Sequence, residues 1–346
     1  MLKKLSVTNL GCFGEAESSI NFSEEVLLAG PNNAGKSMFL SAINIFRSSL
    51  LVGFNWSNDL YSLNSFKDAV HSHDTSRHIA ISMVFLDGDR EYSYGMGLSE
   101  TGSPIFFFDG QASRNSTRAA VDTKLMRGIW FLRPNRSVVP YSMSIGVSAS
   151  PIQPLKPDGS NVTTFLLERW TDRDPRWAMA ESWLRKIDPT MTEMKIPIRG
   201  NQTYFETVFG NLPVNVSLQG SGFQSAAAIV AAVVFSPENS TVIIEEPEAF
   251  LHPDSQETVV DMINDAVNKQ GKQVIFSTHS TNVLKPFYND VSGQGEKRGE
   301  SHAKANPAKF SMWTFRKTAA KATISPYDLR NKAWKQFKDD FKQMWG

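Results

Sequence analysis

Residues 30–37 read GPNNAGKS, which has the glycine, lysine and serine spacing of a phosphate-binding loop. Glycines let backbone N–H groups close around phosphate oxygens, and the amino end of a following helix adds partial positive charge. In such a loop Lys36 reaches the β- and γ-phosphates and Ser37 ligates Mg²⁺, so we expect ATP and Mg²⁺ as ligands. The predicted nucleotide-binding residues of the loop are Gly30, Asn32, Asn33, Ala34, Gly35, Lys36 and Ser37.

A second chemical feature is a pair of adjacent carboxylates at the end of a β-branched strand, residues 241–244, which is followed by Glu245 and Glu246. Open α/β sheets bind ligands at the carboxyl ends of their strands. Successive strand residues point to opposite faces, so Glu245 can support the metal while Glu246 orients or deprotonates the attacking water. Alone, such a sequence is more often a polar turn. The phosphate-binding loop favours the catalytic interpretation.

Two more motifs accompany these. Ser221 and Gly222 begin a small-residue helix and form a second anion site, which the chain's own phosphate loop does not need. The alternative is a serine that caps a buried helix, but the position about 20 residues before the carboxylate strand favours nucleotide contact by Ser221, Gly222 and Gln224. His279 follows the next strand and can hydrogen-bond the γ-phosphate, although a lone histidine at a strand end is usually structural.

The surrounding pattern predicts elements that can hold these residues. A buried strand, residues 26–29, ends at Gly30, and the helix after it is apolar nearly all round, so we expect it inside the core. Strands at 241–244 and 273–277 alternate with helices, which is typical of a mainly parallel α/β sheet. Short strands with Asp-Gly turns between residues 78 and 108 indicate an antiparallel N-terminal lobe. Residues 162–187, with several tryptophans, predict a helical lobe.

Composition bounds the remaining choices. The 346 residues are 41% hydrophobic, enough for a large core, and the net charge of +1 does not by itself indicate nucleic-acid binding. The longest apolar run, residues 226–235, is about half of the roughly 20 residues that a membrane span needs. There is no secretory leader pattern, and the single cysteine, Cys12, excludes an internal disulfide. We therefore expect a cytoplasmic protein without a membrane partner.

In this order the four motifs resemble those of the ABC ATPase superfamily, and the forms GPNNAGKS, GSGFQ, EEPEAFLHP and STHS are similar to OLD-type ATPases, near the RecF and SMC types. The resemblance implies an α/β ABC-ATPase head with an antiparallel β lobe, a RecA-like mainly parallel core and a helical lobe. It assigns Walker A to Lys36 and Ser37, Walker B to Glu245 and the catalytic base to Glu246. His279 becomes the switch histidine, and residues 221–224 act in trans on a second copy.

The resemblance also implies a domain division and departures from the family. We expect residues 1–150 as the N-terminal ATPase lobe, 151–215 as an insertion lobe, 216–290 as the C-terminal ATPase lobe and 291–346 as a basic extension without the Toprim nuclease domain of most OLD-type proteins. Phe223 replaces the second signature glycine of transporters, and His252 stands at their D-loop aspartate. Arg133 and Arg136 resemble a Pro-Arg strand end of the family or are solvated charges.

Two weaker features remain open. Residues 55–78 are polar and predict an exposed arm, in which His71, His73, Asp74 and His78 are a minority candidate for a metal site. From residue 297 onward the chain has 12 Lys and Arg but only 4 Asp and Glu, so this segment is basic. A predicted helix near its end carries one apolar stripe, formed by Trp334, Phe337, Phe341 and Met344. The stripe is interpreted as docking onto the ATPase core, and a DNA or partner surface is the alternative.

From these features we expect an ATPase (ATP phosphohydrolase) that works as an ATP-dependent switch. It would be a homodimer or higher homo-oligomer that closes on ATP and opens on hydrolysis. The change would pass to a separately encoded effector or to DNA, in anti-phage defence. One alternative is a RecF-like repair or recombination ATPase that acts directly on DNA. Another is the nucleotide-binding subunit of a membrane transporter, which Phe223, His252 and the β-rich N-terminal lobe disfavour.

Overall fold

The computed structural model describes residues 1–51, 54, 65–109, 111–113, 125–140, 142–143, 155–293, 302–317, 321–330 and 333–345. Its N-terminal part contains an antiparallel sheet in the order β2-β1-β4-β5-β6-β7. The strands are β1 (Leu2–Thr8), β2 (Ser18–Asn21), β4 (Ile79–Asp87), β5 (Arg90–Leu98), β6 (Ile105–Phe108) and β7 (Gln111–Ser113). The predicted antiparallel lobe is therefore confirmed.

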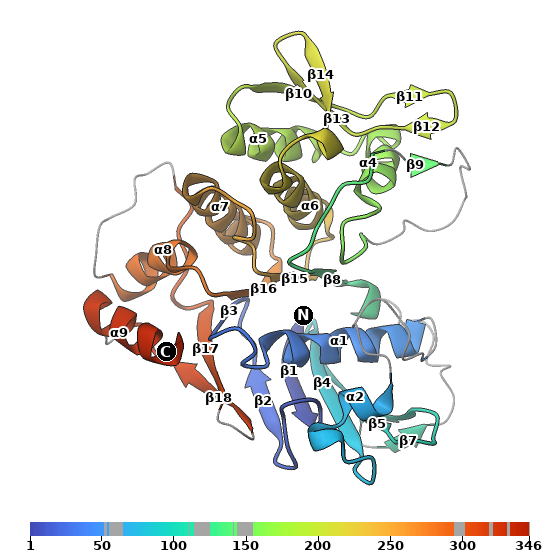
Figure 1. Ribbon diagram of the computed structural model, residues 1–346, viewed down its shortest axis with the longest axis vertical. Helices are drawn as coiled ribbons and strands as arrows, with labels where there is room; N and C mark the ends of the chain where they lie inside the picture. Colours follow the sequence, from blue (N-terminus) through green and yellow to red (C-terminus); the bar gives the residue numbers. More distant parts are fainter. Residues whose placement is uncertain are drawn as a thin grey trace.

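A second six-stranded sheet, in the order β18-β17-β3-β16-β15-β8, forms the core (Figure 1). Its strands are β3 (Glu25–Ala29), β8 (Ile129–Leu132), β15 (Thr241–Glu245), β16 (Gln273–Thr278), β17 (Phe310–Lys317) and β18 (Ala322–Tyr327). Every neighbouring pair is parallel except β17 with β18. The carboxyl ends of five strands therefore meet at one edge, where chemistry in such sheets is concentrated.

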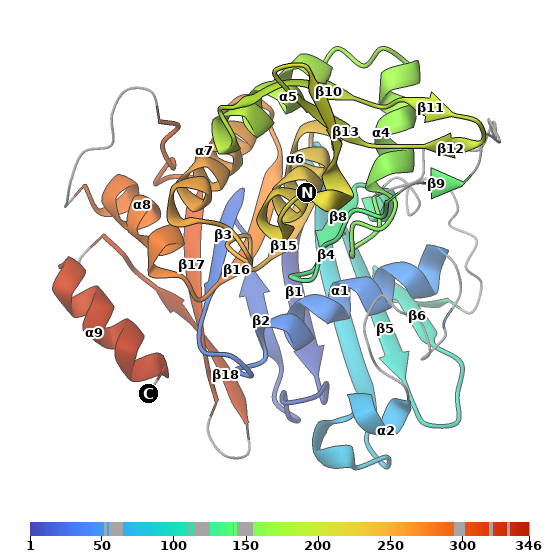
Figure 2. The ribbon, with the colours of Figure 1, turned by 45° about the horizontal axis from the view of Figure 1, so that its top comes forward.

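This core sheet is buried on both faces, as alternate residues of β3 show. Leu27 and Ala29 belong to a core cluster with the helices α6 (Ser221–Phe235), α7 (Pro253–Lys269) and α8 (Thr281–Ser292). Val26 and Leu28 belong to a cluster with α1 (Lys36–Leu51) and the antiparallel sheet. Figure 2 shows α1 crossing between the two sheets. The predicted burial of this helix is confirmed, because its apolar residues have a sheet on each side.

A smaller lobe covers the far side of α6 and carries two helices, α4 (Val162–Thr171) and α5 (Trp177–Ile187). The single helical stretch expected over residues 162–187 is interrupted between them, where Asp174 and Pro175 form part of a turn. Proline lacks the N–H that a continuing helix needs. Short strands complete the lobe: β9 (Ser142–Met143), β10 (Met191–Lys195), β11 (Ile198–Arg199), β12 (Gln202–Thr203), β13 (Glu206–Phe209) and β14 (Leu212–Asn215). A 3-10 turn, η2 (Val216–Leu218), leads from β14 to α6.

The C-terminal part of the chain joins the core sheet. β17 pairs in parallel with β3, and β18 forms the sheet edge. Helix α9 (Trp334–Trp345) packs beside α8, since Trp334 and Phe337 have ring contacts with Tyr288. The interpretation of this apolar stripe as a docking face is confirmed for these two side chains. Phe341 and Met344 lie outside the described side chains.

The polar stretch before β4 is only partly an exposed arm. Residues 55–64 lie outside the described part. Beyond them the chain forms α2 (Phe66–Ala69) and the 3-10 turn η1 (His71–His73). Phe66, Ala69 and Val70 are buried, and Val70 bridges to Leu10. The expectation of an exposed arm is therefore wrong for Phe66, Ala69 and Val70, because these apolar side chains pack into the core while Lys67 and Asp68 stay exposed. None of the described helices combines the length and the apolar character needed to cross a bilayer.

Candidate nucleotide-binding site

The loop between β3 and α1 depends on two glycines, because the backbone conformation and the close neighbours at both positions leave no room for a side chain. Gly30 has φ of 153°, and a Cβ there would lie 2.5 Å from the carbonyl oxygen of Phe315. Gly35 has φ of 100°, and a Cβ there would lie 2.6 Å from Sγ of Cys12. Any side chain at either position would strain the backbone and collide with a neighbour. The glycine spacing is therefore a requirement of the loop geometry.

Lys36 lies across this loop. Its Nζ donates hydrogen bonds to the carbonyl oxygens of Gly30, at 2.6 Å, and Pro31, at 2.9 Å. Burial lowers the pKa of the ammonium, and the carboxylates of Glu245, Glu246 and Glu248 oppose that shift. Backbone carbonyls are weaker partners than phosphate oxygens for an ammonium, so a bound polyphosphate can take over these hydrogen bonds.

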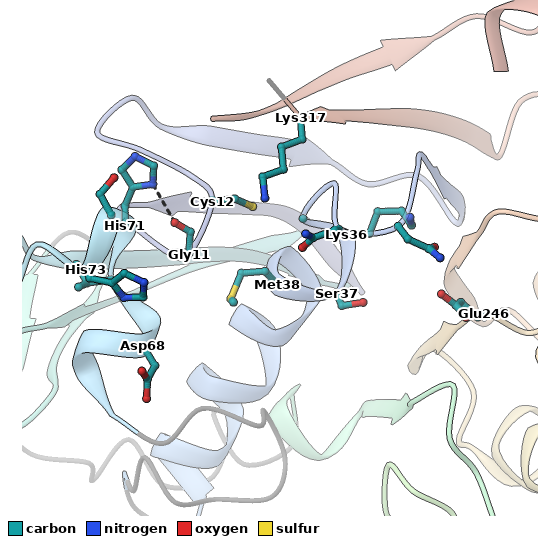
Figure 3. A pocket seen from close by; sticks show the side chains of 15 residues that line it. Gly11, Cys12, Lys36, Ser37, Met38, Asp68, His71, His73, Glu246 and Lys317 are labelled. Carbon is teal, nitrogen blue, oxygen red and sulfur yellow. Dashed lines mark hydrogen bonds between the residues drawn. The ribbon is translucent and has the colours of Figure 1, made fainter. Parts of the chain in front are cut away.

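A cavity of about 720 Å³ opens over the loop (Figure 3). This size lies within the range of small-molecule sites, roughly 300–1,000 Å³. The loop contributes Asn32, Asn33, Gly35, Lys36 and Ser37, and Glu246 closes one end. Residues outside the loop line the remainder: Gly11, Cys12, Met38, Asp68, Val70, His71, Ser72, His73 and Lys317. Ala34 is buried beneath the loop, at 1% exposed surface.

Glu245 fits the role of a metal ligand. It is the last residue of β15, it is only 5% exposed, and its carboxylate accepts a hydrogen bond from Ser37. Oε1 of Glu245 is buried and has no hydrogen-bond partner within the described residues. Burial raises the pKa of this carboxyl. A buried carboxylate oxygen without a donor, next to a serine hydroxyl, is the oxygen donor set that Mg²⁺ prefers.

Glu246 sits on a turn that Arg136 holds. Its backbone has φ of 46°, which is unusual for a residue with a side chain. Arg136, at 3% exposure, donates to the carbonyl oxygens of Glu245 at 2.8 Å and Glu246 at 3.0 Å, and to Oγ of Ser225 at 3.0 Å. Arg136 is thus a structural clamp, and the interpretation as a solvated charge is wrong for it. It also links helix α6 to the turn that carries Glu246.

His279 lies between two carboxylates. Its Nδ1 is 3.6 Å from Oε1 of Glu246 and 3.5 Å from Oε1 of Glu248. The interaction with Glu246 raises the pKa of His279, and the same contact lowers the pKa of Glu246. Glu248, which the sequence interpretation left without a role, is buried and accepts hydrogen bonds from Thr278 Oγ1 and from the backbone N–H groups of His279 and Ser280.

The signature residues lie elsewhere. None of Ser221, Gly222 and Gln224 lines the cavity. Ser221 is exposed at the amino end of α6, whereas a Cβ on Gly222 would lie 2.5 Å from the carbonyl oxygen of Phe250. The side chain of Gln224 is bonded within the chain, accepting from Val138 N–H and donating to two carbonyl oxygens. The folded chain therefore brings together the loop, Glu245, Glu246 and His279, and leaves Ser221, Gly222 and Gln224 apart.

The histidines before β4 do not form a metal site. Within the described residues no group of three His, Cys, Asp or Glu side chains could hold an ion. His71 and His73 line the cavity instead, and Nδ1 of His71 is 2.9 Å from the carbonyl oxygen of Gly11. Sequence analysis missed this lining role and that of Lys317. For Lys317 no local signal was available, because its place at the cavity depends on the pairing of β17 with β3.

Comparisons with known families agree with this geometry. Residues 1–142 match the family described as "AAA ATPase domain", and residues 155–285 match the family described as "AAA domain, putative AbiEii toxin, Type IV TA system". Together with the fold and the converged motifs, these matches define the class of protein. Both parts of the chain match ATPase domains of the AAA type, and the chain is similar to OLD-type proteins.

Two individual proteins also resemble the chain, at low sequence identity or over a short segment. The chain is 26% identical over 343 residues to an OLD nuclease of Thermus scotoductus, covering 84% of this chain and 60% of that protein. It is 31% identical over 105 residues to Endonuclease GajA of Bacillus cereus, covering 25% of this chain and 15% of that protein. The chain thus spans less than two thirds of either relative.

Solved structures support the fold. An SMC head bound to the C-terminal winged-helix domain of ScpA superposes with a TM-score of 0.63 at 12% identity, covering 95% of this chain and 98% of that one. The SMC head domain of Thermotoga maritima gives 0.52 at 15% identity, covering 94% and 99%. At these identities the likeness establishes the ABC-type head fold and nothing further.

Proposed function

We propose that this chain binds Mg-ATP in the cavity over residues 30–37 and hydrolyses it between two copies of itself. The supporting observation is the division of the motifs. Lys36, Ser37 and Glu246 line one cavity, and Glu245 contacts Ser37, whereas Ser221 stands exposed at the amino end of another helix. A helix amino end with a serine suits an anion, and a second molecule's γ-phosphate is the anion that this site would receive.

Within one copy, the residues divide the work. Lys36 exchanges its two carbonyl partners for the β- and γ-phosphates. Ser37 and Glu245 would hold Mg²⁺, which neutralises charge on the phosphates. Glu246, whose lowered pKa keeps it ionised, accepts the proton of the attacking water. His279 stays beside Glu246 and hydrogen-bonds the γ-phosphate.

Apolar side chains around the signature support self-association. Leu218, at 81% exposure, lies three residues before Ser221, and Phe250, at 58% exposure, packs its backbone against Gly222. Large exposed apolar side chains next to a proposed anion site are typical of surfaces that become buried on assembly. ATP bound by one copy would bring this surface of the other copy into contact with it. The dimer would then close on ATP and open after hydrolysis.

The cellular role follows from the OLD-like class. We infer a cytoplasmic switch that acts in anti-phage defence and controls a separately encoded effector, with DNA as the associated substrate. The names of the relatives, a nuclease and an endonuclease, support an association with DNA. ATP turnover that is stimulated by DNA without any partner would instead favour the RecF-like alternative. The existence of an effector can be tested by purifying the tagged protein from its native cells and identifying any protein that co-purifies in equal amount.

The closing of two copies on ATP can be measured by size. Glu246→Gln keeps the shape and hydrogen bonding of the carboxylate but cannot accept the proton, so ATP should bind without being consumed. Light scattering coupled to size exclusion should show the dimer of this variant with Mg-ATP and not without it. Ser221→Arg, made in the same background, should bind ATP and remain monomeric. No nucleotide-dependent change in Glu246→Gln would contradict the proposal.

A further inference from the structure

Lys317 borders the nucleotide cavity although it belongs to the C-terminal part of the chain. β17 runs parallel to β3, with Thr314 opposite Ala29, and the carbonyl oxygen of Phe315 lies against Gly30. Lys317, two residues further on, therefore extends past the edge of the sheet where the phosphate loop begins. Figure 3 shows its ammonium directed toward Cys12 and the loop.

Within the described part of the chain the ammonium of Lys317 has no hydrogen bond or ion pair. The residue is exposed, and only its backbone pairs, with Ala322 of β18. The charge acts on Cys12: burial raises the pKa of that thiol, and the ammonium of Lys317 opposes the shift. Sγ of Cys12 in turn lies against Gly35. The ammonium thus stands near the amino end of α1, where the backbone favours an anion.

The position of Lys317 along the cavity indicates which part of a nucleotide it would meet. In Figure 3, Glu246 lies on one side of Lys36, and Cys12 and Lys317 lie on the other. Glu246 marks the end where water attacks the γ-phosphate. The opposite end continues to Gly11 and His71, which leaves room for the nucleoside. A nucleotide with its γ-phosphate beside Glu246 would therefore place the junction of its phosphate chain and ribose near Lys317.

We propose that Lys317 binds the α-phosphate of the nucleotide, so that strand β17 completes the nucleotide site. A lysine ammonium is a donor-only cation, and a phosphate oxygen is its strongest acceptor. The inference rests on the proposed function, because it needs a nucleotide in the cavity. It makes the C-terminal part of the chain a direct contributor to ATP binding.

The test is calorimetric titration of the full chain with ADP, AMP and adenosine. Lys317→Met keeps the aliphatic length and removes the charge, and it should raise the Kd of ADP and AMP by the same factor, roughly tenfold, as expected for one charge-assisted hydrogen bond. Adenosine, which lacks the phosphate, should bind both proteins equally. Lys317→Arg should restore most of the affinity. The melting temperature without nucleotide should not change, since the side chain is exposed.

Arg316→Met is the matched control. Arg316 is the preceding residue of the same strand, equally exposed, and strand alternation directs it to the other face. Its variant should bind ADP and AMP as the wild type does. Unchanged Kd values in Lys317→Met, or an equal loss for adenosine, would overturn the inference while leaving the ATPase assignment intact. A wild-type protein that binds neither ADP nor ATP would overturn the proposed function itself.

Discussion

Oε1 of Glu248 accepts a hydrogen bond from the backbone N–H of His279 at 2.9 Å, and it also accepts from Ser280 N–H at 3.2 Å. One buried carboxylate thereby ties the turn after β15 to the turn after β16. The two turns carry the proposed base and the switch histidine. The position of His279 therefore depends on a residue that need not touch nucleotide.

Glu248→Leu should impair turnover and spare binding. The apolar side chain removes the Oε1 acceptor that the backbone N–H groups of His279 and Ser280 share, so the turn that carries His279 shifts. We expect kcat to fall roughly tenfold while the Kd for ATP changes by less than about twofold, because misplacing a catalytic group costs rate more than affinity. Glu257→Leu, at an exposed glutamate on α7, is the control. Equal kcat in the two variants would contradict a positioning role for Glu248.

Arg136→Met should destabilise the fold. The guanidinium satisfies buried carbonyl oxygens of Glu245 and Glu246, and burial lowers its own pKa to about 10. Leaving these acceptors without a donor should lower the free energy of unfolding by roughly 3 kcal/mol. Urea denaturation measures the change, with the exposed Arg127→Met as control. A loss within about 0.5 kcal/mol, typical of surface positions, would show that the clamp is dispensable.

Glu25 should make stability depend on pH. It is 0% exposed, neither carboxylate oxygen has a partner within the described residues, and burial raises its pKa to about 8 from the ordinary 4.5. Between these values the folded protein holds a proton that the unfolded chain has released. The stability from this protonated state is complete below pH 4.5 and is lost as pH rises toward 8, by up to about 1.4 kcal/mol per pH unit.

Glu25→Gln does not titrate, so its free energy of unfolding should fall less steeply than that of the wild type over the same range. Urea unfolding of both proteins between pH 5 and pH 8.5 gives the two profiles. Their difference should widen in favour of the glutamine variant as pH rises. Parallel profiles would mean that Glu25 is ionised in the folded protein.

Lys36→Ala should abolish ATP binding, because no other side chain replaces the ammonium between the β- and γ-phosphates. Fluorescence titration with a labelled ATP analogue measures it. The unliganded melting temperature should stay near that of the wild type, since Lys36 bonds only to two carbonyl oxygens of its own loop. Tight ATP binding by this variant would remove the phosphate-loop assignment.

The sequence predicted the residues of the candidate site better than the contacts that hold them in place. The loop, the carboxylates and His279 follow from short motifs, because each lies at the end of a strand that is recognisable by its apolar run. The clamp of Arg136 and the contacts of Glu248 depend on which strands are neighbours. Local pattern does not carry that information. The same holds for Lys317, which reaches the loop only through the pairing of β17 with β3.

The central claim is that each ATP is hydrolysed by residues from two copies, and mixing two inactive variants tests it most directly. Lys36→Ala inactivates the phosphate loop and leaves Ser221 intact. Ser221→Arg blocks the proposed anion site at the start of α6 and leaves the phosphate loop intact. In a mixed dimer one of the two sites then combines the intact Lys36 loop of one copy with the intact Ser221 of the other. Neither variant closes with itself, and each mixed dimer holds one complete site of two, so an equal mixture should recover up to about half of wild-type turnover. Turnover equal to the sum of the separate variants at every mixing ratio would contradict the account.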